Sequence, residues 1–404
     1  MTRRRPAGPG WLTRDVLAIA LSAFSADLGY QAIIAGLPLL LVVEMHAGTP
    51  VFALATAIGY GGGSLLAVAG GRLGDRYGHR RVALCGNAFI PLLGLIGLAV
   101  APWQVVVLFA LGWWARNSRN PSRRAMLVNA VAPAQRGRAF GFLNALDLGG
   151  GLLSTLGLAG LLTIGWSLRG VFLLALVPLG LSTVVLSLAR PGRAPVPAPP
   201  APPASAELAA ARAVEGRTLR AILIATGLFG FSFYNVGFPV LTVAEDGHAL
   251  RAGVIAYALF LGAAAVVGYL AGGRRWRAAP ALALLGYGVS AVATLGLGVV
   301  GALHGPVVVL DLAVLVLGAA VGIIETVEPM MVSSLVWPGR QGAGMGALTG
   351  ARSAGLLVGN IVMGLLYLHG PLAAYLYAAV VAAAGAGLLL RAGRRLPLRI
   401  SGSS

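Results

Sequence analysis

The sequence predicts an all-α integral membrane protein with twelve transmembrane helices arranged as two similar six-helix bundles. Of its 404 residues, 58% are hydrophobic and only 10% are charged, and the mean hydropathy is +0.85. A soluble domain carries about 25% charged residues, so this composition excludes an ordinary water-soluble fold. The 59 glycines suit helices that pack closely in lipid, where small residues let backbones approach each other.

Twelve apolar segments are long enough to cross the bilayer, which takes roughly 20 residues for about 30 Å of hydrocarbon. They lie at approximately 16–43, 51–70, 82–101, 103–131, 136–164, 169–190, 219–243, 252–272, 279–303, 306–336, 343–368 and 371–390. Between the sixth and seventh segments, residues 191–203 read PGRAPVPAPPAPP, a run that is too rich in proline to form a helix. We therefore expect a first bundle over 1–190, a cytoplasmic linker over 191–218, a second bundle over 219–392 and a cytoplasmic tail over 393–404.

The basic residues are concentrated in loops and are not confined to one segment of the chain. The formal net charge is +18, and the basic residues gather in alternate loops when these are counted from a cytoplasmic N-terminus. This is the positive-inside pattern, and it argues for anionic lipid rather than nucleic acid as the partner of the arginines. We expect a multi-pass protein of the bacterial inner membrane with both termini in the cytoplasm and no cleaved signal peptide. The single cysteine and the scattered histidines lack ligand spacing, so neither a metal nor a cofactor is expected.

A short charged turn lies between the second and third apolar segments, at residues 70–82. It carries the pattern G-x-L-x-D-R-x-G-x-R-R, formed by Gly71, Leu73, Asp75, Arg76, Gly78, Arg80 and Arg81. This pattern resembles the signature loop between helices 2 and 3 of the major facilitator superfamily of transporters, and the resemblance extends over residues 12–392. It implies that the loop packs under the cytoplasmic end of the first bundle and helps to latch the outward-open state. Asp75 would then face the start of the eleventh segment near Gly342, because a helix N-terminus favours an anion.

The two halves of the chain share short sequences at matching places. The tetrapeptide Ala-Gly-Gly-Arg at 69–72, after the second segment, recurs at 271–274 after the eighth. After the fourth and tenth segments, Arg136-Gly137 matches Gln341-Gly342 once a three-residue gap is allowed. Two similar halves joined by a linker fit the superfamily plan, in which the two halves rock about a binding site at their interface.

Several charged residues fall inside the predicted membrane segments. An aspartate lies in the first, an arginine pair in the fourth and a glutamate pair in the tenth, and both pairs have the i, i+3 spacing of one helical face. A charge in hydrocarbon costs at least about 2.5–3.5 kcal/mol, so such residues usually face a cavity or a partner. By the family resemblance, segments 1, 4, 7 and 10 line a central pathway. The candidate substrate and proton residues are Asp27, Arg116, Arg119, Asn235, Glu325 and Glu328.

Two interpretations of these charges stay open at this stage. In one, the arginine pair and the glutamate pair neutralise each other as salt bridges that hold the halves together. In the other, a carboxylate takes up a proton on one side of the membrane and releases it on the other. Nearby, Arg123 and Arg124 are expected to reach the cytoplasmic interface, and Asp147 to make a hydrogen bond between helices.

The resemblance implies a secondary transporter rather than an enzyme, working as a monomer on a small-molecule substrate. The first hypothesis is proton-coupled export of small organic or amphipathic molecules, with the proton carrier among Asp27, Glu325 and Glu328. Alternatives are proton-coupled uptake of a small organic anion, bound through Arg116 and Arg119, or a lipid flippase on the same fold. The chain contains no phosphate loop for ATP. A membrane-embedded transferase would need paired acids at the membrane face.

The signature loop leads to the first testable prediction. Asp75→Asn should leave expression intact and lower transport, because the neutral amide loses the charge that holds the helix N-terminus. Membrane expression and the rate of substrate uptake into vesicles check this. Transport at the wild-type rate in this variant would contradict a role for the loop as a latch.

Overall fold

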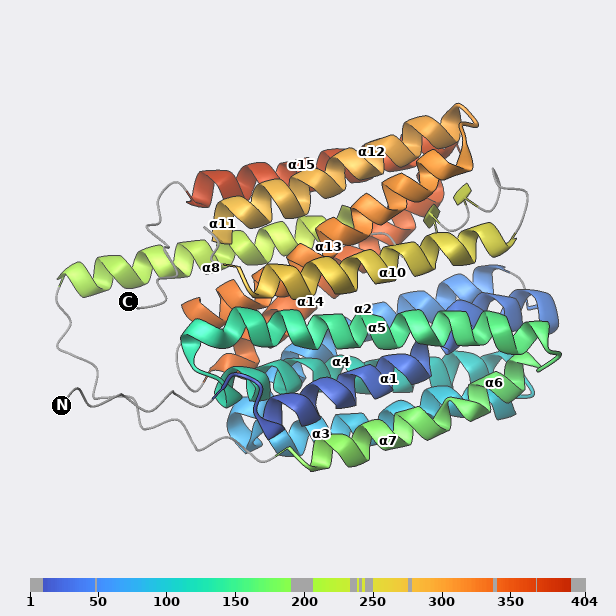
Figure 1. Cartoon of the computed structure of the whole chain (residues 1–404), viewed down its shortest axis with the longest axis horizontal. Helices are drawn as coiled ribbons and strands as arrows, with labels where there is room; N and C mark the ends of the chain where they lie inside the picture. Colours follow the sequence, from blue (N-terminus) through green and yellow to red (C-terminus); the bar gives the residue numbers. More distant parts are fainter. Residues whose placement is uncertain are drawn as a thin grey trace, which may run out of the picture.

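The computed structural model confirms an all-α protein. It describes residues 10–47, 49–189, 206–232, 238–239, 242–243, 250–274, 278–336, 340–367 and 369–393, and this part of the chain contains helices and turns with no strand. The helices lie roughly side by side along the long axis of the molecule (Figure 1). A chain that carries little charge and crosses hydrocarbon must satisfy its backbone hydrogen bonds internally, and parallel helices achieve this.

The helices fall into two sequential sets. The first half contains α1 (Arg14–Pro38), η1 (Leu39–Glu44), α2 (Thr49–Tyr77), α3 (His79–Phe89), η2 (Ile90–Leu98), α4 (Pro102–Ala130), η3 (Pro133–Gln135), α5 (Arg136–Thr163), α6 (Leu168–Leu174) and α7 (Leu176–Ser187). The second half contains α8 (Ala206–Ser232), α10 (Leu250–Gly272), α11 (Ala278–Ala281), η4 (Leu282–Gly288), α12 (Val289–Ala302), α13 (Val307–Leu335), α14 (Gln341–Tyr367) and α15 (Pro371–Gly393).

The helices agree closely with the predicted segments, with one difference at the linker. Among the described residues, ten helical stretches are long and apolar enough to cross a membrane. To these α4 adds a helix of span length that carries several charges. Helix α8 begins at Ala206, so the non-helical part of the expected linker is shorter than 191–218. The alanine-rich stretch after the last proline favours helix, so the helix of the seventh segment extends back into the expected linker.

Four of the spans change their helical geometry, and each change lies beside a proline. Helix α1 passes into the π-helical turn η1 directly after Pro38, and α3 passes into the 3-10 helix η2 at Pro91. Pro178 and Pro280 lie close to the α6–α7 and α11–η4 junctions. Proline removes one backbone donor and clashes with the preceding turn, which explains why the regular helix is interrupted at these positions.

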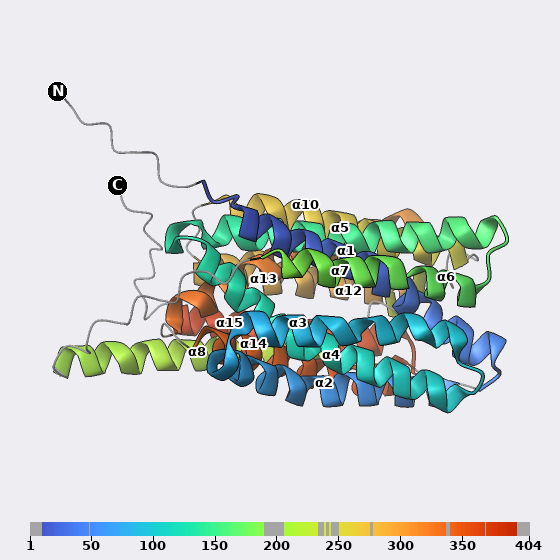
Figure 2. The ribbon, with the colours of Figure 1, turned by 90° about the horizontal axis from the view of Figure 1, so that it is seen from below.

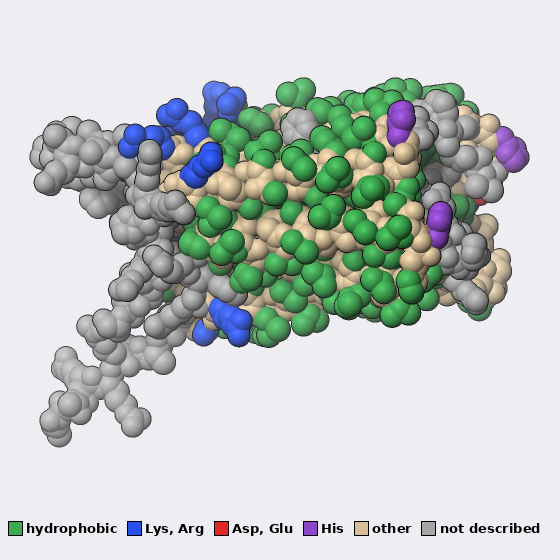
Figure 3. All heavy atoms as spheres, turned by 90° about the horizontal axis from the view of Figure 1, so that it is seen from above, with side chains coloured by type: hydrophobic (Ala, Val, Ile, Leu, Met, Phe, Trp, Pro, Cys, Tyr) green, Lys and Arg blue, Asp and Glu red, His purple; other side chains and the backbone are tan. Residues whose placement is uncertain are grey.

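The outer surface carries the pattern expected for a membrane protein. Large apolar side chains such as Leu65, Val292 and Val308 are more than 70% exposed. Figure 3 shows apolar side chains over the middle of the molecule, with arginines at one end and histidines at the other. We call the arginine-bearing end, where α1 begins and α2 ends, the Asp75 end. An apolar belt between polar ends fits a bilayer, with the arginines at one interface.

The two halves meet along two seams of close helix contact. Helix α2 packs against α14, and α5 packs against α10 (Figures 1 and 2). At the Asp75 end these contacts are backbone to backbone, because glycines face each other. A Cβ atom on Gly71 would lie 2.1 Å from the carbonyl oxygen of Gly342, and one on Gly272 would lie 2.3 Å from that of Gly137. The bundle is therefore closed at this end, and the closure depends on residues without side chains.

Glycine at the α2–α14 seam should be required for closure. Gly71→Ala is expected to lower both transport and the temperature of unfolding, because relief of the overlap costs about 1–3 kcal/mol. Gly157→Ala is the matched control, since a Cβ atom there meets nothing within 4 Å. Vesicle transport and thermal unfolding in detergent measure both effects. Equal behaviour of the two variants would contradict the proposed role of the seam.

Candidate functional site

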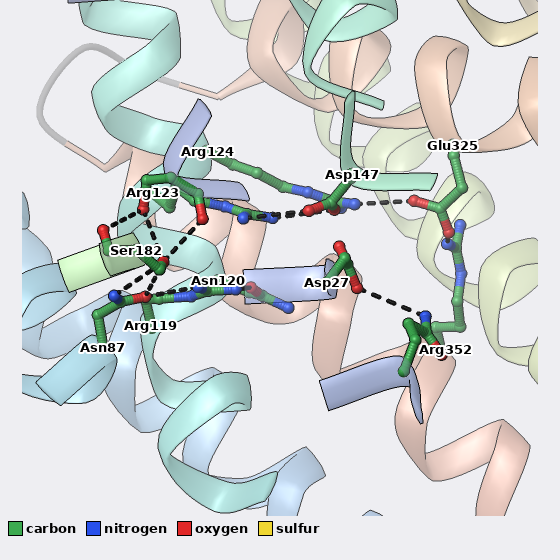
Figure 4. Close-up of polar contacts among 12 residues, drawn as sticks. Asp27, Asn87, Arg119, Asn120, Arg123, Arg124, Asp147, Ser182, Glu325 and Arg352 are labelled. Carbon is green, nitrogen blue, oxygen red and sulfur yellow. Dashed lines mark hydrogen bonds and ion pairs between the residues drawn. The ribbon is translucent and has the colours of Figure 1, made fainter. Parts of the chain in front are cut away.

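Nine charged side chains meet in the interior of the bundle, and we call them the central charge cluster. They project from five helices, α1, α4, α5, α13 and α14. The members are Asp27, Arg116, Arg119, Arg123, Arg124, Asp147, Glu325, Glu328 and Arg352, and Figure 4 shows most of them. Charges in a low-dielectric interior interact far more strongly than in water, so their pairing decides what each can do.

The best-matched pair in the cluster joins α4 to α5. Arg123 donates through Nη1 and Nη2 to the two carboxylate oxygens of Asp147, at 3.2 and 3.1 Å. The Arg123 side chain is only 2% exposed, so the expectation that it reaches the cytoplasmic interface is wrong. Asp147 bonds across helices as expected, but as an ion pair. Two-point geometry of this kind is the strong form of the arginine–carboxylate contact.

Arg119 is fully buried and is held by amides. It donates to the side-chain oxygens of Asn87, at 2.5 Å, and Asn120, at 3.0 Å. Asn87 in turn donates to the hydroxyl of Ser182 at 3.0 Å, which ties α3 and α4 to α7. Within the described residues Arg119 has no ion pair. It faces these amides, which makes it a packing element of the first half rather than an open binding group.

The glutamates of α13 are paired, but with partners other than those predicted. Glu325 accepts from Arg124 at 2.8 Å, which links the first half to the second. Arg352 on α14 forms ion pairs with both Glu325 and Glu328. The interpretation in which these glutamates pair with Arg116 and Arg119 is therefore wrong for the described residues. Arg124 was also expected at the interface, whereas it lies in this interior network.

Further hydrogen bonds hold Glu328 in place. Its side chain is completely buried. It accepts from the hydroxyl of Thr226 at 3.0 Å and from the hydroxyl of Tyr287. With these two donors and Arg352, each carboxylate oxygen has a partner, so Glu328 belongs to the fixed framework of the second half.

Besides Arg119, two members of the cluster have no ion pair within the described part of the chain, Asp27 and Arg116. Asp27 is 3% exposed, and it accepts a hydrogen bond from Gln31 at 3.4 Å. Gln31 in turn accepts from the hydroxyl of Tyr257 on α10 at 3.1 Å, so this chain of contacts crosses between the halves.

The Arg116 guanidinium lies over aromatic rings. Its Cζ atom is 4.9 Å from the centre of the Tyr30 ring and 4.6 Å from that of Trp113. These distances are within the range of cation–π attraction. Its Nε is buried without a hydrogen-bond partner among the described residues. Asp27 interacts electrostatically with both Arg116 and Asp147, so the two unpaired groups share one region of the interior.

The signature loop closes the Asp75 end. Asp75 accepts hydrogen bonds from the backbone amides of Gly342 at 2.9 Å and Ala343 at 2.8 Å, the first residues of α14. The predicted contact between Asp75 and this helix start is confirmed. Gly78 has φ of +96°, a backbone conformation that residues with a side chain rarely adopt. This explains why the turn needs glycine at this position.

The basic residues of the loop lie around this contact. Arg80 donates to the carbonyl oxygens of Ser187 at 2.8 Å and Ala189 at 3.0 Å, where α7 ends. Arg76 lies over the ring of Tyr77 at 5.2 Å. Leu73 and Arg81 are exposed.

The candidate residues predicted from the sequence include part of the central charge cluster. Asn235 lies outside the described residues. Arg352 was counted with the basic residues near the preceding loop and not among the candidates, although it is eleven residues beyond the start of α14 at Gln341. Its position deep within an apolar helix was the feature of the sequence that could have identified Arg352 as a buried charge. Arg123, Arg124 and Asp147 were recognised as polar positions, but their partners could not be known.

The chain belongs to the Major Facilitator Superfamily, whose family model matches residues 19–355. Members of this family are transporters. Two solved members share the fold over 94% of this chain. One is the human organic anion transporter MFSD10, with a TM-score of 0.76 and 18% identity over all of its length. The other is the proton:xylose symporter XylE, with a TM-score of 0.68 and 15% identity over 94% of its length.

Two curated relatives match shorter stretches. The cephamycin export protein CmcT of Amycolatopsis lactamdurans is 34% identical over 186 residues, which cover 45% of this chain and 34% of that protein. The multidrug resistance protein MdtH of Photorhabdus laumondii subsp. laumondii is 26% identical over 193 residues, which cover 44% of each. The matched stretches thus span between a third and a half of these relatives.

Pairing in the cluster leads to a prediction on stability. Arg123→Met leaves Asp147 buried without its partner and should lower the free energy of unfolding by about 3–5 kcal/mol. The double variant Arg123→Met/Asp147→Leu should recover much of this loss, because it removes both charges. Denaturant unfolding in detergent compares the two. A double variant as unstable as the single one would contradict the argument that the pair is structural.

Proposed function

We propose that this transporter exports small organic or amphipathic molecules in exchange for protons, by alternating access between its two halves. Support for export comes from two relatives whose names describe cephamycin export and multidrug resistance. Support for the proton comes from one structural observation, the buried carboxyl of Asp27, which has no ion pair among the residues that the structure describes.

The choice of Asp27 follows from what protonation would cost at each site. Asp147, Glu325 and Glu328 are each paired with an arginine, so a proton on any of them breaks an ion pair in the interior. Asp27 can gain or lose a proton without such a loss. Asp147 and Arg116 lie near it with opposite effects on its charge, so small movements of the helices change its preference for the proton.

Movement of the halves can change the surroundings of Asp27 through its hydrogen-bonded contacts with Gln31 and Tyr257. Tyr257 belongs to the second half and donates to Gln31, which donates to Asp27. When the halves separate, this link breaks and the surroundings of Asp27 change. Coupling needs a site whose proton affinity depends on the conformation, and this arrangement supplies one.

The same proposal assigns the orientation. The Asp75 end, with its exposed arginines, faces the cytoplasm by the positive-inside rule. The conformation closed at this end is then the one that faces outward, in which a substrate is released. Asp75 on the start of α14 stabilises this conformation, and the cycle returns inward when that contact breaks.

A second candidate is the uptake of a small organic anion together with a proton. The observation that favours it is Arg116, whose guanidinium has aromatic neighbours and no carboxylate partner within the described part of the chain. An anion bound there would neutralise a positive charge near Asp27 and so favour protonation of this carboxyl group. Anion and proton would therefore bind together and move in the same direction, opposite to the exchange proposed above.

Proton movement in liposomes tests both candidates. The protein is reconstituted around an internal pH dye, and a panel of organic cations, anions and sugars is added. We expect a substrate-dependent pH change in the wild type that Asp27→Asn abolishes, while substrate exchange between the two sides continues in this variant. Glu325→Gln is the matched control, since it makes the same carboxyl-to-amide change at a paired site, and it should keep the pH change at a lower rate.

The sign of the pH change separates the candidates. Protons that move opposite to the substrate support exchange, and protons that accompany an organic anion support the second candidate. A pH change that persists in Asp27→Asn would exclude this residue as the proton carrier.

A further inference from the structure

The corner between α13 and α14 is held at both helix ends by the first half. The N-terminal end of α14 binds the carboxylate of Asp75 through the amides of Gly342 and Ala343. The C-terminal end of α13 binds Arg136, which donates through Nη1 to the carbonyl oxygen of Ser333 at 2.8 Å. Both contacts cross from one half to the other at the Asp75 end.

The signs of the two charges fit the helix ends they meet. A helix carries partial positive charge at its N-terminus and partial negative charge at its C-terminus, where the last carbonyls lack intrahelical partners. Asp75 meets the former, and Arg136, the first residue of α5, meets the latter. Ser333 is buried, so its carbonyl has little access to water, and a charged donor is worth more there than a neutral one.

In the internal repeat, the positions that match Asp75 and Arg136 do not carry the same charges. Gln341 occupies the position that matches Arg136, and it donates at 3.4 Å to Val336, the residue that caps the same helix α13. In the sequence, the loop after α10 carries Arg274 where the first half has Arg72, and no acid follows before residue 278. The first half therefore supplies the charges, and the second half supplies the helix ends.

We propose that Arg136 is a positioning residue of the transport cycle, which acts with Asp75 as a two-point clamp on the α13–α14 corner. The clamp stabilises the conformation closed at the Asp75 end, and both contacts break when that end opens. The inference rests on the proposed alternating access, but it needs neither the substrate nor the coupled proton.

Distances between spin labels at the two ends of the bundle test the clamp. One pair, Arg72→Cys with Arg340→Cys, reports the Asp75 end, and a second pair, His46→Cys with His369→Cys, reports the opposite end. All four positions are exposed. The background is Cys85→Ser, because Cys85 is exposed and would also take a label.

Arg136→Gln should raise the ratio of open to closed populations at the Asp75 end roughly tenfold, the factor that corresponds to a charged hydrogen bond of about 1.4 kcal/mol. The opposite end should close in step. Asp75→Asn should act in the same direction, and the double variant should show about the product of the two factors. Arg136→Lys keeps the charge and should restore part of the closed population. Arg138→Gln, an exposed arginine on the same helix, should behave as the wild type.

Each outcome is decisive. Distances in Arg136→Gln that match the wild type, while Asp75→Asn opens the Asp75 end, would overturn the role of Arg136. A general broadening at both ends would also overturn it, because that result marks a loss of packing rather than a shift between two conformations. If the glutamine variant fails to fold, the lysine variant decides, since its shorter reach should open the Asp75 end in part. If no variant or condition moves either pair, alternating access itself fails.

Discussion

The architecture depends on one constraint, the cost of an unpaired charge in a low-dielectric interior. Six members of the central charge cluster satisfy it through ion pairs, and Arg119 does so through the amides of Asn87 and Asn120. These contacts fix α4 against α3 and α5, and α13 against α14. Asp27 and Arg116 also lack an ion pair in the described part of the chain, and the function proposed above rests on these two residues.

The contacts between the halves also explain how a rigid interior can be compatible with movement. Glu325 has two arginine partners, Arg124 from the first half and Arg352 from the second. In the proposed alternating access, the ion pair between Glu325 and Arg352 stays within the second half. The Glu325 carboxylate therefore remains paired when the halves separate. The glycine seams bring backbones together without interlocking side chains, and the ends of α13 and α14 are held by single charged residues. Such interfaces can break and re-form as units, as rocking of two bundles requires.

Much of the fold could be predicted, because it follows from local sequence. The lengths of the apolar segments predicted the positions of the helices. The attraction of a carboxylate to a helix N-terminus predicted the contact between Asp75 and α14, which the structure confirms. The site could be predicted only in part, because its pairing joins residues far apart in the chain. The partner of Arg124 lies 201 residues away, and only packing reveals it. Arg352 was missed because a charge near a loop was taken for part of the loop. The extension of α8 back to Ala206 could not be predicted, because proline marks where helix is forbidden, not where it resumes.

We propose that Asp27 alone among the buried carboxylates of the described residues changes its protonation during transport. Infrared difference spectroscopy of the reconstituted protein, recorded between acid and neutral pH, observes the stretch of a protonated carboxyl group directly. We predict that the carboxyl band that appears on acidification contains a component from a buried group in the wild type and in Glu325→Gln, and that Asp27→Asn loses this component. A component that survives in Asp27→Asn and disappears in Glu325→Gln would contradict the claim and would assign the proton to the paired framework instead.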